Sequence, residues 1–214
     1  MPIIVIGGIK GGSGKTTIAT NLVVIRSLIE GKKVLFVDAD EQKSAFDWVE
    51  HRESSGIQTP WTTICLSGSA LRSQVSKMAP DYDDIIIDSG GRDTTSQRSA
   101  LTIADIFLAP FQPRSLDIWT IISVSSLIND IKIVNPSLRS FSILNRGDAQ
   151  GKDNEDASEI LKENETVKYL PTSVIQRKSF SNAAALGLGV TEMKPQDKKA
   201  SSEIQNLCDF LFKQ

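Results

Sequence analysis

The chain contains little cysteine and no long apolar run, and each absence excludes a class of protein. Its two cysteines, Cys65 and Cys208, are far apart and form no C-x-x-C pair, which argues against a disulfide framework and against a thiolate cluster. No run approaches the ~20 apolar residues of a membrane-spanning helix. The first apolar run ends at Gly7 and Gly8 and follows no basic stretch, so it predicts a strand and not a signal peptide. We therefore expect a cytoplasmic protein.

The chain also lacks an excess of charge of either sign. Charged residues make up 23% of the 214 residues, the formal net charge is −2 and the pI is near 5.5. Any binding to nucleic acid must therefore come from a local basic patch and not from a global positive field. A chain of this length can form one sizeable core, and no internal repeat or low-complexity tract divides it. We expect a single domain over residues 1–214.

Short apolar runs rich in β-branched residues alternate with segments of helical spacing. The runs lie at residues 3–6, 34–37, 85–87, 106–109 and 141–144. Continuous apolar strands separated by helices are typical of a parallel sheet that is buried on both faces. The sequence therefore predicts the α/β class, with an open, mainly parallel sheet flanked by helices on both faces.

A glycine-rich turn, "IKGGSGKTT" at residues 9–17, follows the first predicted strand. It matches the phosphate-binding pattern G-x-x-x-x-G-K-[ST], except that Ile9 stands at the first glycine position. In a strand–turn–helix context, such a loop directs backbone N–H groups and a helix N-terminus at phosphate oxygens. We expect Lys15 to contact the β- and γ-phosphates and the Thr16 hydroxyl to coordinate Mg²⁺. The residues expected to bind the nucleotide are Gly11, Gly12, Ser13, Gly14, Lys15, Thr16 and Thr17.

Three aspartates follow predicted strands and should meet at the carboxyl edge of the sheet, beside this loop. Asp38 and Asp40 lie in "VLFVDADEQ", and Asp88 lies in "DDIIIDSGG". We expect Asp88 to hold the Mg²⁺ as a Walker B aspartate and Asp38 to support the metal site. Asp40 is expected to polarise the attacking water. The alternative for an acidic residue directly after a strand is that it caps a helix or a turn.

These segments together resemble the ParA/MinD family of deviant Walker A ATPases. The resemblance rests on "KGGSGKTT", "VDADEQ" and "IIIDSGG", and continues through "LAPFQPRSLD" at residues 108–117 and "LPTSVIQRKSFSNAAALGLGVTE" at residues 170–192. Because the loop lies at the very start of the chain, the resemblance is greatest to the small ParA-type partition ATPases. In that family the first position of the loop need not be glycine, and the lysine after it, here Lys10, is the signature residue.

The resemblance implies a Mg²⁺-dependent ATPase in which ATP is sandwiched between the two subunits of a homodimer. The signature Lys10 would then reach across to the phosphates bound by the partner, as an arginine finger does. Asn145, in "ILNR", stands where the family usually recognises the adenine ring, and backbone around Pro171 would complete that pocket. Asn145 could equally cap a turn. The resemblance thus implies ATP and Mg²⁺ as cofactors.

The family's functions leave several roles open for this chain. The first is plasmid or chromosome partition, in which the ATP dimer binds non-specific DNA on the nucleoid and a centromere-binding or adaptor protein stimulates hydrolysis. Arg177 and Lys178, in a block whose basic residues help to bind DNA in the family, are the expected DNA contacts. The alternative is positioning of another cargo, such as a conjugation complex or a protein organelle, or a MinD-like cycle on a membrane. The role of Arg92, in "SGGRDTTSQR" after Asp88, stays open.

The last segment, "SSEIQNLCDFLFKQ", bears on the membrane alternative. Its apolar side chains Ile204, Leu207, Cys208 and Leu211 share one helical face. Its polar face carries Glu203 and Asp209, which would repel anionic lipid. We therefore expect this helix to pack on the sheet and not to bind a membrane.

Overall fold

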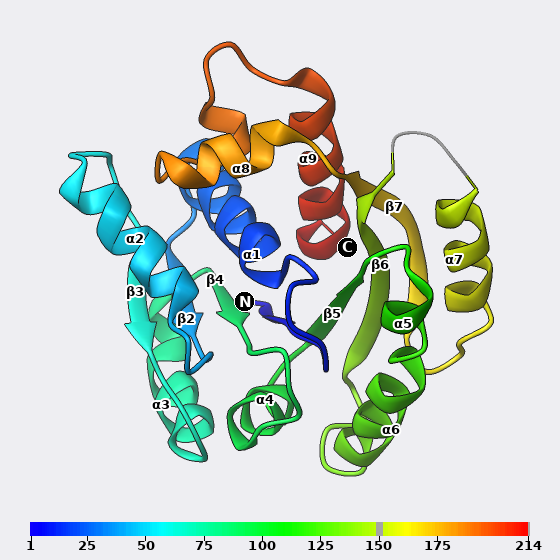
Figure 1. Cartoon of the computed structure of the whole chain (residues 1–214). Helices are drawn as coiled ribbons and strands as arrows, with labels where there is room; N and C mark the ends of the chain where they lie inside the picture. Colours follow the sequence, from blue (N-terminus) through cyan, green and yellow to red (C-terminus); the bar gives the residue numbers. More distant parts are fainter. Residues whose placement is uncertain (149–151, 214) are drawn as a thin grey trace.

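Seven parallel strands form a central sheet in the computed structural model, which describes residues 1–148 and 152–213 apart from the side chains of residues 115 and 116 (Figure 1). Their order across the sheet is β3-β2-β4-β1-β5-β6-β7. The strands are β1 Ile3–Ile6, β2 Val34–Asp38, β3 Thr62–Cys65, β4 Asp84–Asp88, β5 Ile106–Phe111, β6 Arg139–Gly147 and β7 Lys168–Ile175. The predicted α/β class and parallel sheet are confirmed.

The five strands expected from the sequence occupy adjacent positions in the middle of the sheet. They are buried on both faces, so their sequences are largely apolar, with the buried Ser142 of β6 as an exception. The two strands that the sequence analysis missed, β3 and β7, lie at the two edges. Each is partly exposed, and β7 contains Pro171, which interrupts the strand pattern. Edge position therefore explains why neither strand has a clear apolar signal.

Helices cover both faces of the sheet (Figure 1). One face carries α1, α2, α8 and α9, and the other carries α3, α4, α6 and α7. Side chains alternate along β1, so that Ile4 and Ile6 join the first apolar layer while Ile3 and Val5 join the second. The helices are α1 Lys15–Val24, α2 Ser44–Ser54, α3 Ala70–Met78, α4 Thr95–Leu101, α5 Ser115–Ile118, α6 Ile121–Lys132, α7 Asp153–Lys162, α8 Lys178–Ala185 and α9 Lys198–Phe212, with a π-helical turn at Ile25–Ile29 after α1.

The last helix, α9, packs as the sequence predicts. Its apolar face, formed by Ile204, Leu207, Cys208 and Leu211, is buried, and the helix contacts β7 and α1. Of the helices that the structure describes, none is both long and apolar enough to cross a membrane.

A buried arginine ties α2 to the segment that follows α8. Arg52 is 0% exposed, and its Nη1 and Nη2 each donate to a carboxylate oxygen of Glu192 at 2.8 Å. The same guanidinium donates to the carbonyls of Gln58 and Gly187. It also lies 5.0 Å from the ring of Trp61, which stacks on Trp48. All of its donors are directed at acceptors within the fold, so this charge is buried at a tolerable cost.

Removing this guanidinium should destabilise the fold. Arg52→Met removes the guanidinium donors of the Glu192 carboxylate, which keeps only the Gly189 N–H, and of the Gln58 and Gly187 carbonyls, and we expect a loss of about 3 kcal/mol in the free energy of unfolding. Urea denaturation monitored by the fluorescence of Trp48 and Trp61 measures it. Arg72→Met, at an exposed position on α3, is the control and should change stability by less than about 0.5 kcal/mol. Equal stability of the two variants would contradict the role given to Arg52.

Candidate functional site

The glycine-rich loop at residues 7–14, which we call the phosphate-binding loop, joins the carboxyl end of β1 to the start of α1. Gly12 and Gly14 have φ angles of +80° and +88°, a left-handed conformation that glycine adopts at little cost. A Cβ added to Gly14 would lie 2.1 Å from Nδ2 of Asn145. Glycine at position 14 is therefore required by both the backbone conformation and the closeness of β6.

Three side chains hold carbonyl groups of this loop. In a trans peptide the N–H points away from the preceding carbonyl, so each bond also fixes the direction of one N–H group. Each of these N–H groups therefore points away from the side chain that holds its carbonyl, and oriented backbone N–H groups are what a phosphate site requires. The bonds run from Lys15 Nζ to the Lys10 carbonyl at 2.9 Å, from Gln112 Nε2 to the Gly12 carbonyl at 2.8 Å and from Asn145 Nδ2 to the Ser13 carbonyl at 2.6 Å.

The ammonium group of Lys15 lies in the interior of the site. The residue is only 6% exposed, and burial lowers the pKa of Lys15, against the opposing attraction of Asp88 and Asp40. Within the described part of the chain, its hydrogen-bond partner is a neutral carbonyl of its own loop. A buried cation with so weak a partner is suited to bind an anionic phosphate oxygen.

Asp88 ends β4 directly opposite Asp38, which ends β2. Burial, with a smaller contribution from the charges of Asp38 and Asp40, raises the pKa of Asp88 to about 7, against a hydrogen bond from Thr16 and the charge of Lys15. Within the part of the chain that the structure describes, Oδ1 of Asp88 has no hydrogen-bond partner. A buried, unpaired carboxylate oxygen beside the Thr16 hydroxyl fits Mg²⁺, which takes one or two protein carboxylates and completes its shell with phosphates and water.

Asp38 and Asp40 also bond to the backbone that follows them. Oδ1 of Asp38 accepts the N–H of Asp40 at 3.0 Å, and Oδ2 accepts the N–H of Phe46 in the first turn of α2 at 2.9 Å. Oδ1 of Asp40 accepts the N–H of Gln42 at 3.1 Å. The capping alternative is therefore seen in both residues, and Asp38 holds the loop in place with both of its oxygens.

The carboxylate of Asp40 packs against the loop that follows Asp88. A Cβ added to Gly90 would lie 3.2 Å from the Asp40 carboxylate, and one added to Gly91 would lie 2.6 Å from the Gly11 nitrogen. The loop that carries Asp40, the loop that follows Asp88 and the phosphate-binding loop thus meet within contact distance. Arg92, in the loop that follows Asp88, is exposed.

Lys10 forms an ion pair with Asp117 at the start of α5. The Lys10 side chain is 44% exposed, whereas that of Asp117 is 7% exposed. The two residues are 107 positions apart in the chain. The lysine expected to act on the partner subunit is therefore held within its own subunit in this structure.

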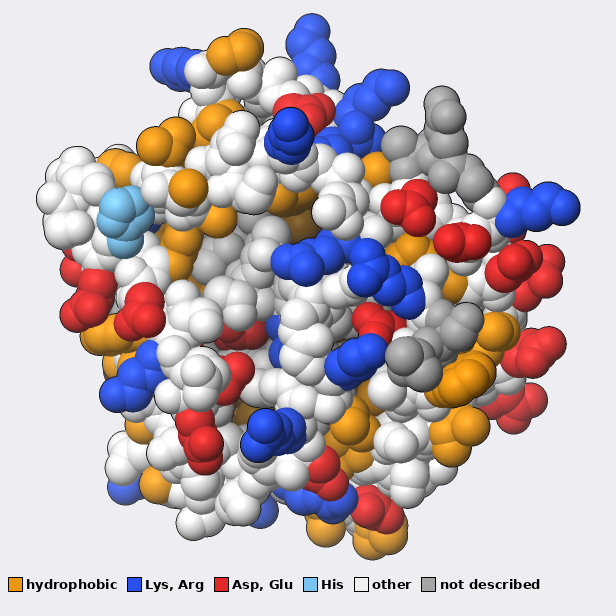
Figure 2. Space-filling view, in the orientation of Figure 1, with side chains coloured by type: hydrophobic (Ala, Val, Ile, Leu, Met, Phe, Trp, Pro, Cys, Tyr) orange, Lys and Arg blue, Asp and Glu red, His pale blue; other side chains and the backbone are white. Residues whose placement is uncertain are grey.

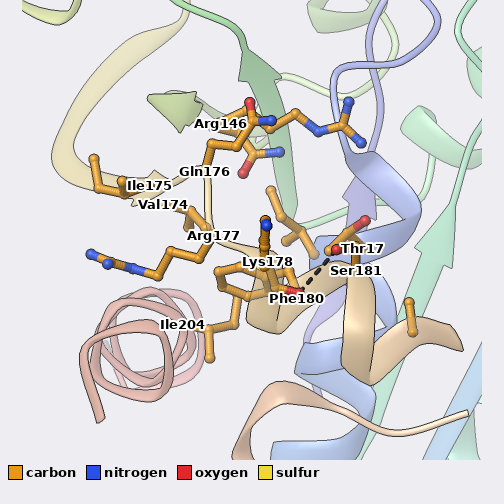
Figure 3. A pocket seen from close by; sticks show the side chains of 13 residues that line it. Thr17, Arg146, Val174, Ile175, Gln176, Arg177, Lys178, Phe180, Ser181 and Ile204 are labelled. Carbon is orange, nitrogen blue, oxygen red and sulfur yellow. Dashed lines mark hydrogen bonds between the residues drawn. The ribbon is translucent and has the colours of Figure 1, made fainter. Parts of the chain in front are cut away.

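Two cavities flank the phosphate-binding loop. The first, of about 530 Å³, lies beside Thr17 and Asn145 and has apolar walls from Val174 and Phe180 (Figure 3). The second, of about 340 Å³, lies beside Gly11 and Asp40. The first has the apolar character suited to a purine base, and the second adjoins the carboxylate expected to polarise water. A nucleotide lying across the loop would join the two.

The wall of the first cavity differs in part from what the sequence predicts. Pro171 lies within β7 and does not line it; residues 174–178 do. Arg146 and Gln176, neither of which the sequence analysis had singled out, also line the cavity (Figure 3). Arg146 has a φ of +55°, which is uncommon for a residue other than glycine.

The two expected DNA contacts differ in how they are held. Nη2 of Arg177 donates to Oε1 of Glu203 at 2.7 Å, whereas Lys178 is exposed at the start of α8. Figure 2 shows Lys and Arg side chains around the cavity and along the upper edge of the same face. Lys178 is therefore the better placed of the two to contact a polyanion.

Comparisons with known proteins agree with this geometry. The chain matches the family model described as the CobQ/CobB/MinD/ParA nucleotide-binding domain over residues 4–190. It is 28% identical over 205 residues to the maintenance of carboxysome distribution protein A of Halothiobacillus neapolitanus, across 94% of this chain and 92% of that protein. It is 28% identical over 119 residues to the protein ParA of Rhizobium radiobacter, across 55% of this chain and 51% of that protein.

A solved structure extends the likeness to the whole fold. The ATP complex of a Cyanothece McdA variant has a TM-score of 0.83 to this chain at 18% identity, across 100% of this chain and 96% of that chain. At this identity the likeness concerns the arrangement of the strands and helices.

The raised pKa of Asp88 predicts a pH-dependent stability in protein free of metal and nucleotide. Because the pKa of Asp88 in the folded state is about 7 and the ordinary pKa of an aspartate is 3.8, the unfolded chain releases its proton first, and stability falls as the pH rises from about 4 to 7. Asp88→Asn removes this loss. We expect the free energy of unfolding of the variant to rise by about 2–4 kcal/mol relative to that of wild type across that window, and to show no such gain below it. Urea denaturation at a series of pH values, with the exposed Asp81→Asn as control, tests this; a constant difference would contradict it.

Proposed function

This chain belongs to the CobQ/CobB/MinD/ParA family of nucleotide-binding domains, and on that premise we propose that it is a Mg²⁺-dependent ATPase of the ParA type. In this proposal the ATP-bound chain forms a homodimer, binds non-specific DNA and positions a cargo when a partner protein stimulates hydrolysis. The observation that carries the proposal is the meeting of Lys15, Asp88 and the Asp40 loop at one edge of the sheet. Its proposed location is the cytoplasm, on the nucleoid when ATP is bound.

The residues at this edge divide the chemistry between them. Lys15 exchanges the Lys10 carbonyl for the β- and γ-phosphate oxygens, a stronger, charge-assisted partner. Thr16 and Asp88 hold the Mg²⁺, which neutralises phosphate charge when bound. Asp40, beside the second cavity, orients the attacking water. Asp38 keeps Asp40 in position through its bond to the Asp40 N–H.

Lys10 supplies the proposed link between ATP and dimer formation. It stands on the phosphate-binding loop and is almost half exposed, so it can reach a second subunit that faces this loop. To do so it must leave Asp117. A positive charge supplied from outside the subunit accelerates phosphoryl transfer by ~10³–10⁵ in enzymes with an arginine finger. A monomer that keeps Lys10 on Asp117 would therefore hydrolyse ATP slowly.

The cargo follows less directly from the site. We propose a DNA molecule, moved by partition with the help of a centromere-binding or adaptor protein. The match along almost the whole chain to a protein named for carboxysome distribution supports a second candidate, the positioning of a protein organelle. A membrane cycle gains no support, because the apolar face of α9 is buried against the sheet.

The ATP switch is tested by binding to random-sequence duplex DNA with ADP and with a non-hydrolysable ATP analogue. We expect salt-sensitive binding with the analogue alone and its loss in Lys10→Ala. Asp117→Asn frees Lys10, so half-maximal DNA binding should need about 2- to 5-fold less analogue. A change of that size matches the free energy that a partly exposed ion pair contributes. Asp130→Asn, which loses a surface contact with Arg98, is the control. DNA binding that ignores the nucleotide, or is absent throughout, would contradict the proposal.

Lys178 provides a separate test of the DNA surface. Each lost phosphate contact lowers the slope of log K against log salt concentration by about 1. We expect Lys178→Ala to lower the slope by about 2 in a dimer, when DNA binding is measured at a saturating concentration of the ATP analogue. Lys77→Ala, exposed on α3 on the opposite face of the sheet, should leave the slope unchanged. Fluorescence anisotropy at several salt concentrations measures both.

A further inference from the structure

The segment that runs from the end of β5 into α5, residues 112–117, touches the phosphate-binding loop at two points. Near its start, Nε2 of Gln112 donates to the Gly12 carbonyl at 2.8 Å. At its end, Asp117 pairs with Lys10. The first contact falls on the middle of the loop, where Gly12 has a φ of +80°.

The direction of the Gly12–Ser13 peptide is fixed by the bond from Gln112 to the Gly12 carbonyl. The flanking carbonyls of Lys10 and Ser13 are held by Lys15 and Asn145. A peptide next to a glycine can rotate with little steric resistance. If it rotated, the Gly12 carbonyl would replace the Ser13 N–H on the side where the phosphates bind. An acceptor dipole would then face an anion, which is repulsive.

Gln112 is itself held in place by its own segment. Its carbonyl accepts the N–H of Arg114 at 2.7 Å across the intervening Pro113, which fixes one backbone angle and is buried. The next bond runs from the N–H of Asp117 to the Arg114 carbonyl at 2.9 Å. The segment is therefore a tight turn, and the amide of Gln112 loses little conformational freedom when it bonds to the loop.

We propose that Gln112 is a positioning residue of the nucleotide site, which holds the Gly12–Ser13 peptide so that the Ser13 N–H faces the phosphates. The inference rests on the proposed nucleotide site, but it requires neither a dimer, nor DNA, nor hydrolysis. It makes the affinity for a nucleoside diphosphate depend on a donor at position 112. Because the residue acts through the loop, it need not touch the nucleotide.

Three substitutions separate the donor from the shape of the side chain. Gln112→Met keeps a similar shape and removes the donor, and should weaken ADP binding about 3- to 10-fold, as one lost hydrogen bond does. Gln112→Lys restores a donor and should bind ADP within about twofold of wild type. Gln112→Glu removes the donor and adds a negative charge near the phosphates, so it should bind more weakly than Gln112→Met. Calorimetric titration with Mg-ADP measures all three affinities.

The controls separate this inference from the proposed function. Gln74→Met makes the same change at an exposed position on α3 and should bind ADP as wild type does. Thermal unfolding of each apo variant confirms that the fold is kept. With ATP, Gln112→Met should raise KM and leave kcat unchanged.

If wild type fails to bind Mg-ADP, the proposed nucleotide site is wrong. If wild type binds and the Met variant binds equally well, or if the Lys and Glu variants lose affinity equally, only the role of Gln112 is wrong.

Discussion

The site depends on the parallel register of β2, β4 and β1. This register sets Asp38 directly beside Asp88 and brings both level with the end of β1, where the phosphate-binding loop begins. A change of register by one residue would turn each side chain to the opposite face of the sheet. The strands are buried on both sides by two apolar layers, so that such a shift is strongly opposed. The position of the acidic groups is thus a consequence of the core and not of the loops that carry them.

The charges at this edge are not balanced within the chain. Three carboxylates, those of Asp38, Asp40 and Asp88, face one buried ammonium, that of Lys15, and burial opposes the charge of the lysine and of two of the acids. A divalent cation would relieve the carboxylates, and a polyphosphate would relieve the lysine. Metal and nucleotide are therefore expected to bind together more strongly than either alone. This reciprocity is a property of the charges and does not depend on the cargo that the protein moves.

The sequence predicts the parts of this site that depend on local patterns. The glycine-rich loop and the aspartates that end buried strands have short, specific signals, and each central strand contains a largely apolar run. The ion pair of Lys10 and Asp117 has no such signal, because its partners are 107 residues apart and meet only after β5 joins β1. Gln112 lies inside a segment that resembles the family, but nothing in its neighbours indicates that its amide reaches Gly12. For Asn145 the sequence leaves adenine recognition and turn capping equally open, whereas the structure adds a third contact, to the Ser13 carbonyl. Sequence patterns identify which residues end a strand, and only the fold identifies which strand ends meet.

The buried Arg52 has a mechanical consequence. Its α2 helix begins just after the Asp38–Asp40 loop, and the Gly187 carbonyl and the Glu192 carboxylate that it binds belong to the segment directly after α8. The guanidinium joins these two parts, so that a tilt of α2 is transmitted to α8. Lys178 lies at the opposite end of α8 from these contacts. A rotation of α2 at the Asp40 loop would therefore also displace α8 and, with it, Lys178.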